Sequence, residues 1–95
     1  MAEVETRRYV VTGRVQGVGF RWFVEREAAQ LGMAGWVRNH EDGSVEVMAT
    51  GTPEQQRSLR LKLREGPRAA RVDMVQESTA PYLEAHSFRT EQGEW

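Results

Sequence analysis

The sequence predicts an α+β fold, a ferredoxin-like split βαβ sandwich in which two helices cover one face of an antiparallel sheet. Two observations carry this prediction. Strand-like and helix-like segments follow one another in the order βαββαβ, and a chain of 95 residues can bury only one core. A content of 39% hydrophobic residues is ordinary for a globular protein. We therefore expect a single domain over residues 1–95.

The first strand and the first helix are predicted on either side of a glycine-rich segment. Residues 8–14 contain aromatic and β-branched residues and a closing Gly13, which is typical of a strand. From Phe20 onward, apolar side chains recur every three or four residues, and Gly32 follows as a stop. We predict an amphipathic helix over Phe20–Leu31.

A hairpin is predicted after the first helix. Ala34–Asn39 and Ser44–Thr50 both alternate between apolar and polar residues, as half-buried strands do. Between them, Asp42-Gly43 favours a primed two-residue turn. The two segments should therefore pair as antiparallel strands.

The second helix is predicted from the signals at its two ends. A capping-box pattern begins at Thr52, with Pro53 at the first helical position, and Gly66 supplies a stop. The leucines at 59, 61 and 63 alternate as in a strand, but the first and last also stack at i, i+4 on a helix. We expect a helix over Pro53–Glu65. Residues 72–76 then suggest a fourth strand, and residues 87–90 a short fifth.

Composition excludes several function classes. With 13 basic and 14 acidic residues, the net charge of −1 gives no overall field that would attract nucleic acid or an anionic membrane. The absence of cysteine excludes disulfides, thiolate nucleophiles and cysteine-ligated metals. No histidine and carboxylate cluster has metal-ligand spacing, so no metal or cofactor is expected. The charged start of the chain has no apolar run of signal or membrane length, so we expect a cytoplasmic protein.

The glycine-rich segment is the strongest candidate for a binding site. It could be a simple tight turn, and its spacing matches no nucleotide-binding loop. However, glycines let successive backbone N–H groups converge, and the helix opening at Phe20 adds unpaired N–H groups and a positive dipole end. Arg21 would face that positive end unfavourably unless an anion lay between them. The alternative is an exposed ion pair with Glu25, four residues on.

Asn39 is the second candidate, at the end of a predicted strand. On residue type alone, it is an ordinary residue for starting a turn. A neutral side chain that both donates and accepts could instead orient a water beside a bound phosphate.

These residues resemble a known family. Gly13-Arg14-Val15-Gln16-Gly17-Val18-Gly19-Phe20-Arg21 and Gly35-Trp36-Val37-Arg38-Asn39 look like the double signature of the acylphosphatases. Gly66-Pro67 with Ala70-Arg71-Val72 is similar to a later block of that family, so the resemblance runs from about Tyr9 to Phe88. Two departures are Gln56, where similar proteins usually carry an aliphatic residue, and the polar final strand.

The resemblance implies a hydrolase that cleaves acyl phosphates to carboxylate and phosphate. Arg21 would hold the phosphoryl oxygens and Asn39 would place the attacking water. The backbone around the phosphoryl group would be that of residues 15–20, namely Val15, Gln16, Gly17, Val18, Gly19 and Phe20. The expected partner is a small-molecule acyl phosphate, with no nucleic acid, membrane, metal or cofactor, and the protein is expected to be a monomer. A carboxylate leaving group, whose conjugate acid has a pKa near ~4, needs no general acid.

Two other functions stay open. RNA-recognition domains share this topology, but their aromatic residues lie on a central strand, whereas here they open the first helix. An acylphosphatase-like domain could also serve as a binding module, as at the start of larger maturation enzymes, although a chain ending at Trp95 leaves no room for further domains. Trp22, Trp36 and Trp95 are interpreted as packing or tail residues, and His40 as an exposed turn residue.

Overall fold

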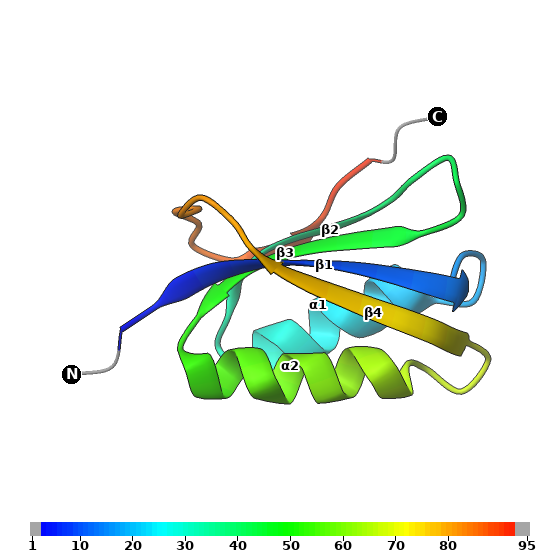
Figure 1. Ribbon diagram of the computed structural model, residues 1–95, viewed down its shortest axis with the longest axis horizontal. Helices are drawn as coiled ribbons and strands as arrows, with labels where there is room; N and C mark the ends of the chain where they lie inside the picture. Colours follow the sequence, from blue (N-terminus) through cyan, green and yellow to red (C-terminus); the bar gives the residue numbers. More distant parts are fainter. Residues whose placement is uncertain (1–2, 93–95) are drawn as a thin grey trace.

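The computed structural model describes residues 3–92, which form two helices on one face of a five-stranded sheet (Figure 1). Trp95 lies outside the described residues. In chain order the elements are β1 (Glu5–Arg14), α1 (Phe20–Gln30), β2 (Ala34–Asn39), β3 (Val45–Gly51), α2 (Pro53–Glu65), β4 (Arg71–Thr79) and β5 (Phe88–Thr90). The predicted α+β, ferredoxin-like sandwich is confirmed.

The sheet differs from the prediction in one respect, because it is mixed rather than wholly antiparallel. Its strand order is β4-β1-β3-β2-β5, and β5 runs parallel to β2. The strands β4 and β5 lie at opposite edges, so residues 80–87 must cross the face of the sheet that the helices leave open. Two hydrogen bonds hold this crossing segment to the sheet: Leu83 N–H donates to Thr6 Oγ1 (2.9 Å), and Thr50 Oγ1 donates to the Leu83 carbonyl oxygen (2.8 Å). The direction of β5 follows from this route.

The core lies between the sheet and the two helices. Its fully buried side chains come from both layers and include Tyr9, Val11, Val37 and Val47 of the sheet and Phe20, Val24, Leu59 and Leu63 of the helices. The alternating leucines of α2 are therefore helical: Leu59 and Leu63 face the core, and Leu61 is 58% exposed.

Gln56 is a buried amide with every polar atom paired. It is only 2% exposed; its Oε1 accepts from the Tyr9 hydroxyl at 2.7 Å, and its Nε2 donates to the carbonyl oxygens of Glu5 (3.0 Å) and Ala49 (2.8 Å). Burial raises the pKa of the Tyr9 hydroxyl, which stays a donor. A polar residue is tolerated here because its hydrogen bonds offset the cost of burying it.

Two local predictions, the capping box of α2 and the primed turn between β2 and β3, have different outcomes. The capping box is confirmed: Gln55 N–H donates to Thr52 Oγ1 (3.2 Å), and Thr52 N–H donates to Gln55 Oε1 (2.8 Å). The primed turn is wrong, because in residues 3–92 only glycines have positive φ and a primed turn of this kind needs two such residues. The hairpin instead closes through His40 N–H and the Ser44 carbonyl oxygen (2.9 Å) around three residues, the last being Gly43 with φ 94°.

Candidate active site

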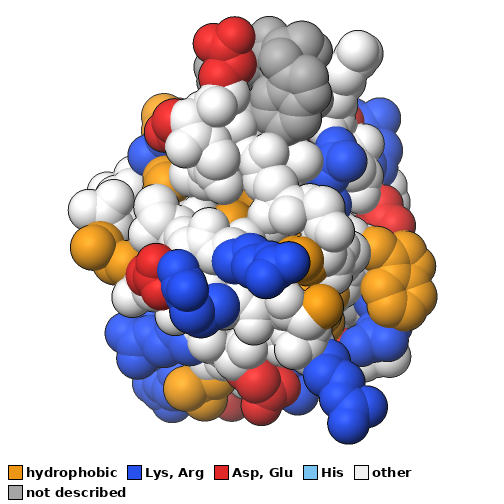
Figure 2. All heavy atoms as spheres, turned by 90° about the vertical axis from the view of Figure 1, so that its right-hand side faces the viewer, with side chains coloured by type: hydrophobic (Ala, Val, Ile, Leu, Met, Phe, Trp, Pro, Cys, Tyr) orange, Lys and Arg blue, Asp and Glu red, His pale blue; other side chains and the backbone are white. Residues whose placement is uncertain are grey.

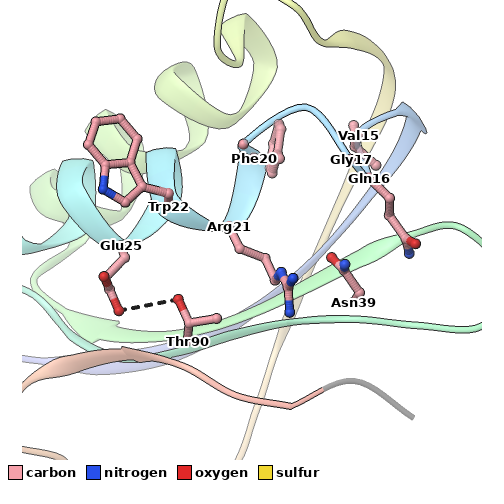
Figure 3. Close-up of a pocket in the computed structure, with 10 residues that line it drawn as sticks. Val15, Gln16, Gly17, Phe20, Arg21, Trp22, Glu25, Asn39 and Thr90 are labelled. Atoms are coloured by element: carbon pink, nitrogen blue, oxygen red, sulfur yellow. Dashed lines mark hydrogen bonds between the residues drawn. The ribbon is translucent and has the colours of Figure 1, made fainter. Parts of the chain in front are cut away.

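A cavity of about 310 Å³ opens where the β1–α1 loop (Val15–Gly19) meets the end of β2 (Figure 3). Its lining residues come from four separate parts of the chain: Val15, Gln16, Gly17, Gly19, Phe20, Arg21, Trp22, Glu25, Asn39 and Thr90. Of the residues predicted for the site, all but Val18 line this cavity; Val18 packs against the core instead. The fold thus brings Arg21 and Asn39 together.

The β1–α1 loop borders the cavity. Gly17 (φ 73°) and Gly19 (φ 78°) have left-handed backbone that favours glycine, although a side chain there would meet nothing within 4 Å. Gly19 is the N-cap of α1 and supplies no side-chain cap, and the first turn of the helix has no acidic residue. Within residues 3–92, the N–H groups of the loop donate to no other backbone group. The loop and helix end therefore form a ready anion site.

Arg21 points into this space without a counter-ion. Its side chain makes no hydrogen bond or ion pair with any described residue, and Glu25 accepts from Thr90 Oγ1 (3.2 Å) instead. The alternative pairing of Arg21 with Glu25 is therefore absent. A cation at the positive end of a helix is disfavoured by about 0.3–1 kcal/mol. An anion held between the helix end and the guanidinium would reverse that cost.

Asn39 brings an unpaired acceptor to the same cavity. It is 5% exposed, and its Oδ1 is buried with no hydrogen-bond partner among residues 3–92. Its side chain extends toward that of Arg21 (Figure 3). The turn that follows is held by Asp42, whose Oδ1 accepts from Ser44 N–H (2.9 Å) and Ser44 Oγ (2.6 Å); these bonds lower the pKa of the Asp42 carboxyl. Asn39 is thus not needed to start the turn.

Gln16 ties the β1–α1 loop to the β2–β3 turn. Its Nε2 donates to the carbonyl oxygens of His40 (2.7 Å) and Ser44 (2.9 Å), on either side of that turn. Both hydrogens of the amide nitrogen are therefore used within the protein. This role was not foreseen from the sequence, where a glutamine inside a glycine-rich segment carries no signal of its partner.

Glu46 supports the strand end that carries Asn39, from the open face of the sheet. Its carboxylate is 7% exposed and accepts from Arg8 Nε (2.6 Å) and Arg38 Nε (3.1 Å), and its Oε1 lies 2.6 Å from His40 Nε2. Burial alone would raise the pKa of Glu46, but the hydrogen bonds from Arg8, His40 and Arg38 lower it below its ordinary value. His40 is half-buried and contacts Glu46, so its interpretation as an exposed turn residue is wrong.

The sequence interpretation also missed three lining residues. Trp22, interpreted as a packing or tail residue, is 61% exposed at the edge of the cavity, and the Arg26 guanidinium lies 4.7 Å from the centre of its ring. Glu25 had been considered only as a partner for Arg21. Thr90 reaches the cavity because β5 pairs with β2, a contact that no local pattern encodes. Trp36 is half-buried on the open face, where Arg38 stacks on it at 4.8 Å.

Basic side chains surround this end of the molecule. Figure 2 faces the end that carries the β1–α1 loop, and Lys and Arg side chains gather there. Exposed basic residues near this end include Arg14 at the end of β1, Arg64 in the last turn of α2, Arg68 between α2 and β4, and Arg71 at the start of β4. They make a local positive field despite the overall charge of −1.

The described residues hold neither a metal cluster nor a membrane-spanning helix. No three or more His, Cys, Asp or Glu side chains in residues 3–92 are grouped so that they could hold a metal ion. Neither helix of this region combines the length and apolar character that crossing a membrane requires.

The chain is similar in sequence and in fold to known acylphosphatases. A family model described as Acylphosphatase matches residues 7–90. A curated acylphosphatase of Koribacter versatilis is 61% identical over 92 residues, covering 96% of this chain and 83% of the relative. The crystal structure of acylphosphatase from Bacillus subtilis superposes with a TM-score of 0.88 at 37% identity, covering 94% of this chain and 99% of that one.

The same fold also forms part of a larger protein. The crystal structure of full-length HypF in its phosphate- and nucleotide-bound form matches 99% of this chain with 13% of its own length, at a TM-score of 0.90 and 24% identity. At that identity the similarity shows the fold alone.

Proposed function

The chain belongs to the acylphosphatase family, and we propose that it hydrolyses the carboxyl–phosphate bond of acyl phosphates by in-line attack of water in the cavity beside the β1–α1 loop. In this proposal Arg21 and the loop N–H groups hold the phosphoryl oxygens. Asn39 positions the water.

One observation carries the proposal: a cation that lacks an anion, Arg21, and a residue whose buried acceptor lacks a donor, Asn39, line the same cavity. Among residues 3–92, the Arg21 guanidinium has no anion and the buried Asn39 Oδ1 has no donor. Leaving a buried carbonyl oxygen unpaired costs about 1–3 kcal/mol. A phosphoryl group beside Arg21 and a water donating to Asn39 would satisfy both requirements at once. No other small ligand is needed to satisfy these two side chains.

The reaction requires little from the side chains. The water oxygen forms a bond to phosphorus while the bond from phosphorus to the acyl oxygen breaks, and the electron pair leaves with the acyl oxygen as carboxylate. The water proton passes to an oxygen of the phosphoryl group. In the loose transition state the charge on the equatorial oxygens is stabilised by the guanidinium and the N–H groups. Glu25, the only carboxylate among the described lining residues, lies across Arg21 from Asn39 (Figure 3) and so is not placed to act on this water.

Hydrolysis of benzoyl phosphate in excess chelator tests the proposal. Arg21→Ala should lower kcat/KM by about 10²–10³, as expected for loss of one donor to a developing oxyanion. Arg21→Lys should restore little, because an ammonium lacks the two-pronged geometry of the guanidinium. A folded protein that binds phosphate but does not turn over benzoyl phosphate would instead be a binding module.

A further inference from the structure

The cavity is larger than a phosphoryl group and one water require. Three terminal oxygens and a water, at about 30 Å³ for each water-sized atom, account for roughly 120 Å³, whereas the cavity holds about 310 Å³. Part of the remaining space lies where the lining continues beyond Arg21. That lining is formed by Trp22, Glu25 and Thr90.

The direction of attack assigns this remaining space to one part of the substrate. In an in-line displacement, the attacking water and the departing acyl oxygen lie on opposite sides of phosphorus. Figure 3 shows Asn39 on one side of the Arg21 side chain and Glu25 with Thr90 on the other. With the water at Asn39, the acyl group therefore extends toward Glu25 and Thr90.

The charges at that end of the cavity are not balanced by its neighbours. Among the lining residues that the structure describes, only Arg21 and Glu25 are charged, and a bound phosphoryl group would occupy Arg21. The nearest basic residues in sequence do not pair with Glu25: Arg26 stacks on Trp22 and pairs with Glu27 (2.9 Å), and Arg89 lies 3.6 Å from Glu91. The bond from Thr90 Oγ1 holds the Glu25 carboxylate against β5, at the wall of the cavity.

We propose that Glu25 makes the enzyme select acyl phosphates whose acyl group carries no further negative charge. This inference rests on the proposed function, since it needs the phosphoryl group at Arg21 and the water at Asn39. A second carboxylate or phosphate on the acyl part would approach Glu25, and like charges in a half-exposed, salt-containing site discriminate by about two- to tenfold. A neutral aromatic or aliphatic acyl group meets no such repulsion.

Two substrates that differ by one distant charge test this selection. Benzoyl phosphate and 4-carboxybenzoyl phosphate form the same type of leaving carboxylate, so effects of Glu25 on bond breaking largely cancel in the ratio of their kcat/KM values. The wild-type protein should favour benzoyl phosphate by about two- to tenfold. Glu25→Gln should bring the ratio near 1. Glu27→Gln, an equal charge change on the same helix outside the cavity lining, should leave the ratio at its wild-type value.

Salt provides a second test that needs no variant. The wild-type preference should shrink between low ionic strength and about 1 M salt, where screening acts within roughly 3 Å. A wild-type ratio near 1, or a preference that Glu25→Gln leaves intact, would overturn the selection while Arg21-dependent hydrolysis of benzoyl phosphate still stood. Failure of the wild-type protein to hydrolyse benzoyl phosphate would overturn the proposed function, and the selection with it.

Discussion

Replacing Gln16 by leucine would cut the tie between the β1–α1 loop and the β2–β3 turn. Leucine is close to glutamine in size but cannot donate to the carbonyl oxygens of His40 and Ser44. Each of these oxygens keeps a second donor, because Gly43 N–H donates to His40 (3.1 Å) and His40 N–H donates to Ser44 (2.9 Å). The variant therefore loses two hydrogen bonds without leaving either oxygen fully unpaired.

The size of the effect follows from those two bonds. At about 0.5–1.5 kcal/mol each, their loss should lower the free energy of unfolding by about 1–3 kcal/mol. For a domain of this size, each kcal/mol lowers Tm by roughly 4–8 °C. The loop also loses its fixed distance from Asn39, and a displacement of about 1 Å can cost up to about 100-fold in rate. We expect kcat for benzoyl phosphate to fall by about 10- to 100-fold, with a smaller loss of phosphate inhibition.

Calorimetry and steady-state kinetics at a temperature where the variant is folded would measure both effects. Gln30→Leu is a matched control, because Gln30 is exposed in the last turn of α1 and makes no side-chain hydrogen bond with the described residues. A lower Tm with unchanged kcat would show that the tie stabilises the fold without positioning the loop. Unchanged Tm and unchanged kcat would show that the tie does not form.

Three further changes give distinct outcomes. Asn39→Ala should lower kcat for benzoyl phosphate while inorganic phosphate still inhibits competitively; equal loss of both would reassign Asn39 to phosphate binding or to structure. Glu46→Gln should cost about 1–3 kcal/mol of stability at pH 7 in urea unfolding. Because the pKa of Glu46 is lowered in the fold, its contribution is present above its unfolded pKa, near ~4.3. It is lost as the pH falls through the lowered folded value, so variant and wild type should converge in acid; a difference that stays constant as the pH falls would contradict this. Thr52→Ala should lower stability by about 1 kcal/mol through loss of the capping box, and an unchanged Tm would show that the cap contributes nothing.

Local signals predicted most elements of the fold. The capping box at Thr52, the apolar spacing from Phe20 and the alternation in Ala34–Asn39 each act within a few residues, so they can be read without the rest of the chain. The direction of β5 could not, because it follows from a crossing that depends on Thr6 and Thr50 in distant strands. The predicted turn type was wrong because Asp42-Gly43 also suits a three-residue loop, in which only the glycine needs a positive φ.

The residues of the candidate site likewise divide into those that the sequence predicted and those that depend on tertiary packing. Arg21 and the β1–α1 loop were predicted from backbone physics within one segment. Asn39 was a candidate from its side-chain chemistry, and the resemblance supplied the reason to prefer a role in the site over a role in the turn. Their roles stay predictions, although the structure brings them into one cavity. The placement of Glu25 and Thr90 in the cavity wall depends on how β5 packs beside α1. No pattern within either segment predicts that packing.

The crossing of residues 80–87 also has a consequence for biosynthesis. A ribosome delivers Arg21 and Asn39 well before Thr90, which follows the segment that passes over the open side of the sheet. The central strand β1 must likewise wait for β4 before both its edges are paired. A nascent chain halted before residue 88 would thus hold both proposed catalytic side chains and still lack the far wall of the pocket. Turnover should begin only after β5 has been synthesised and has paired with β2.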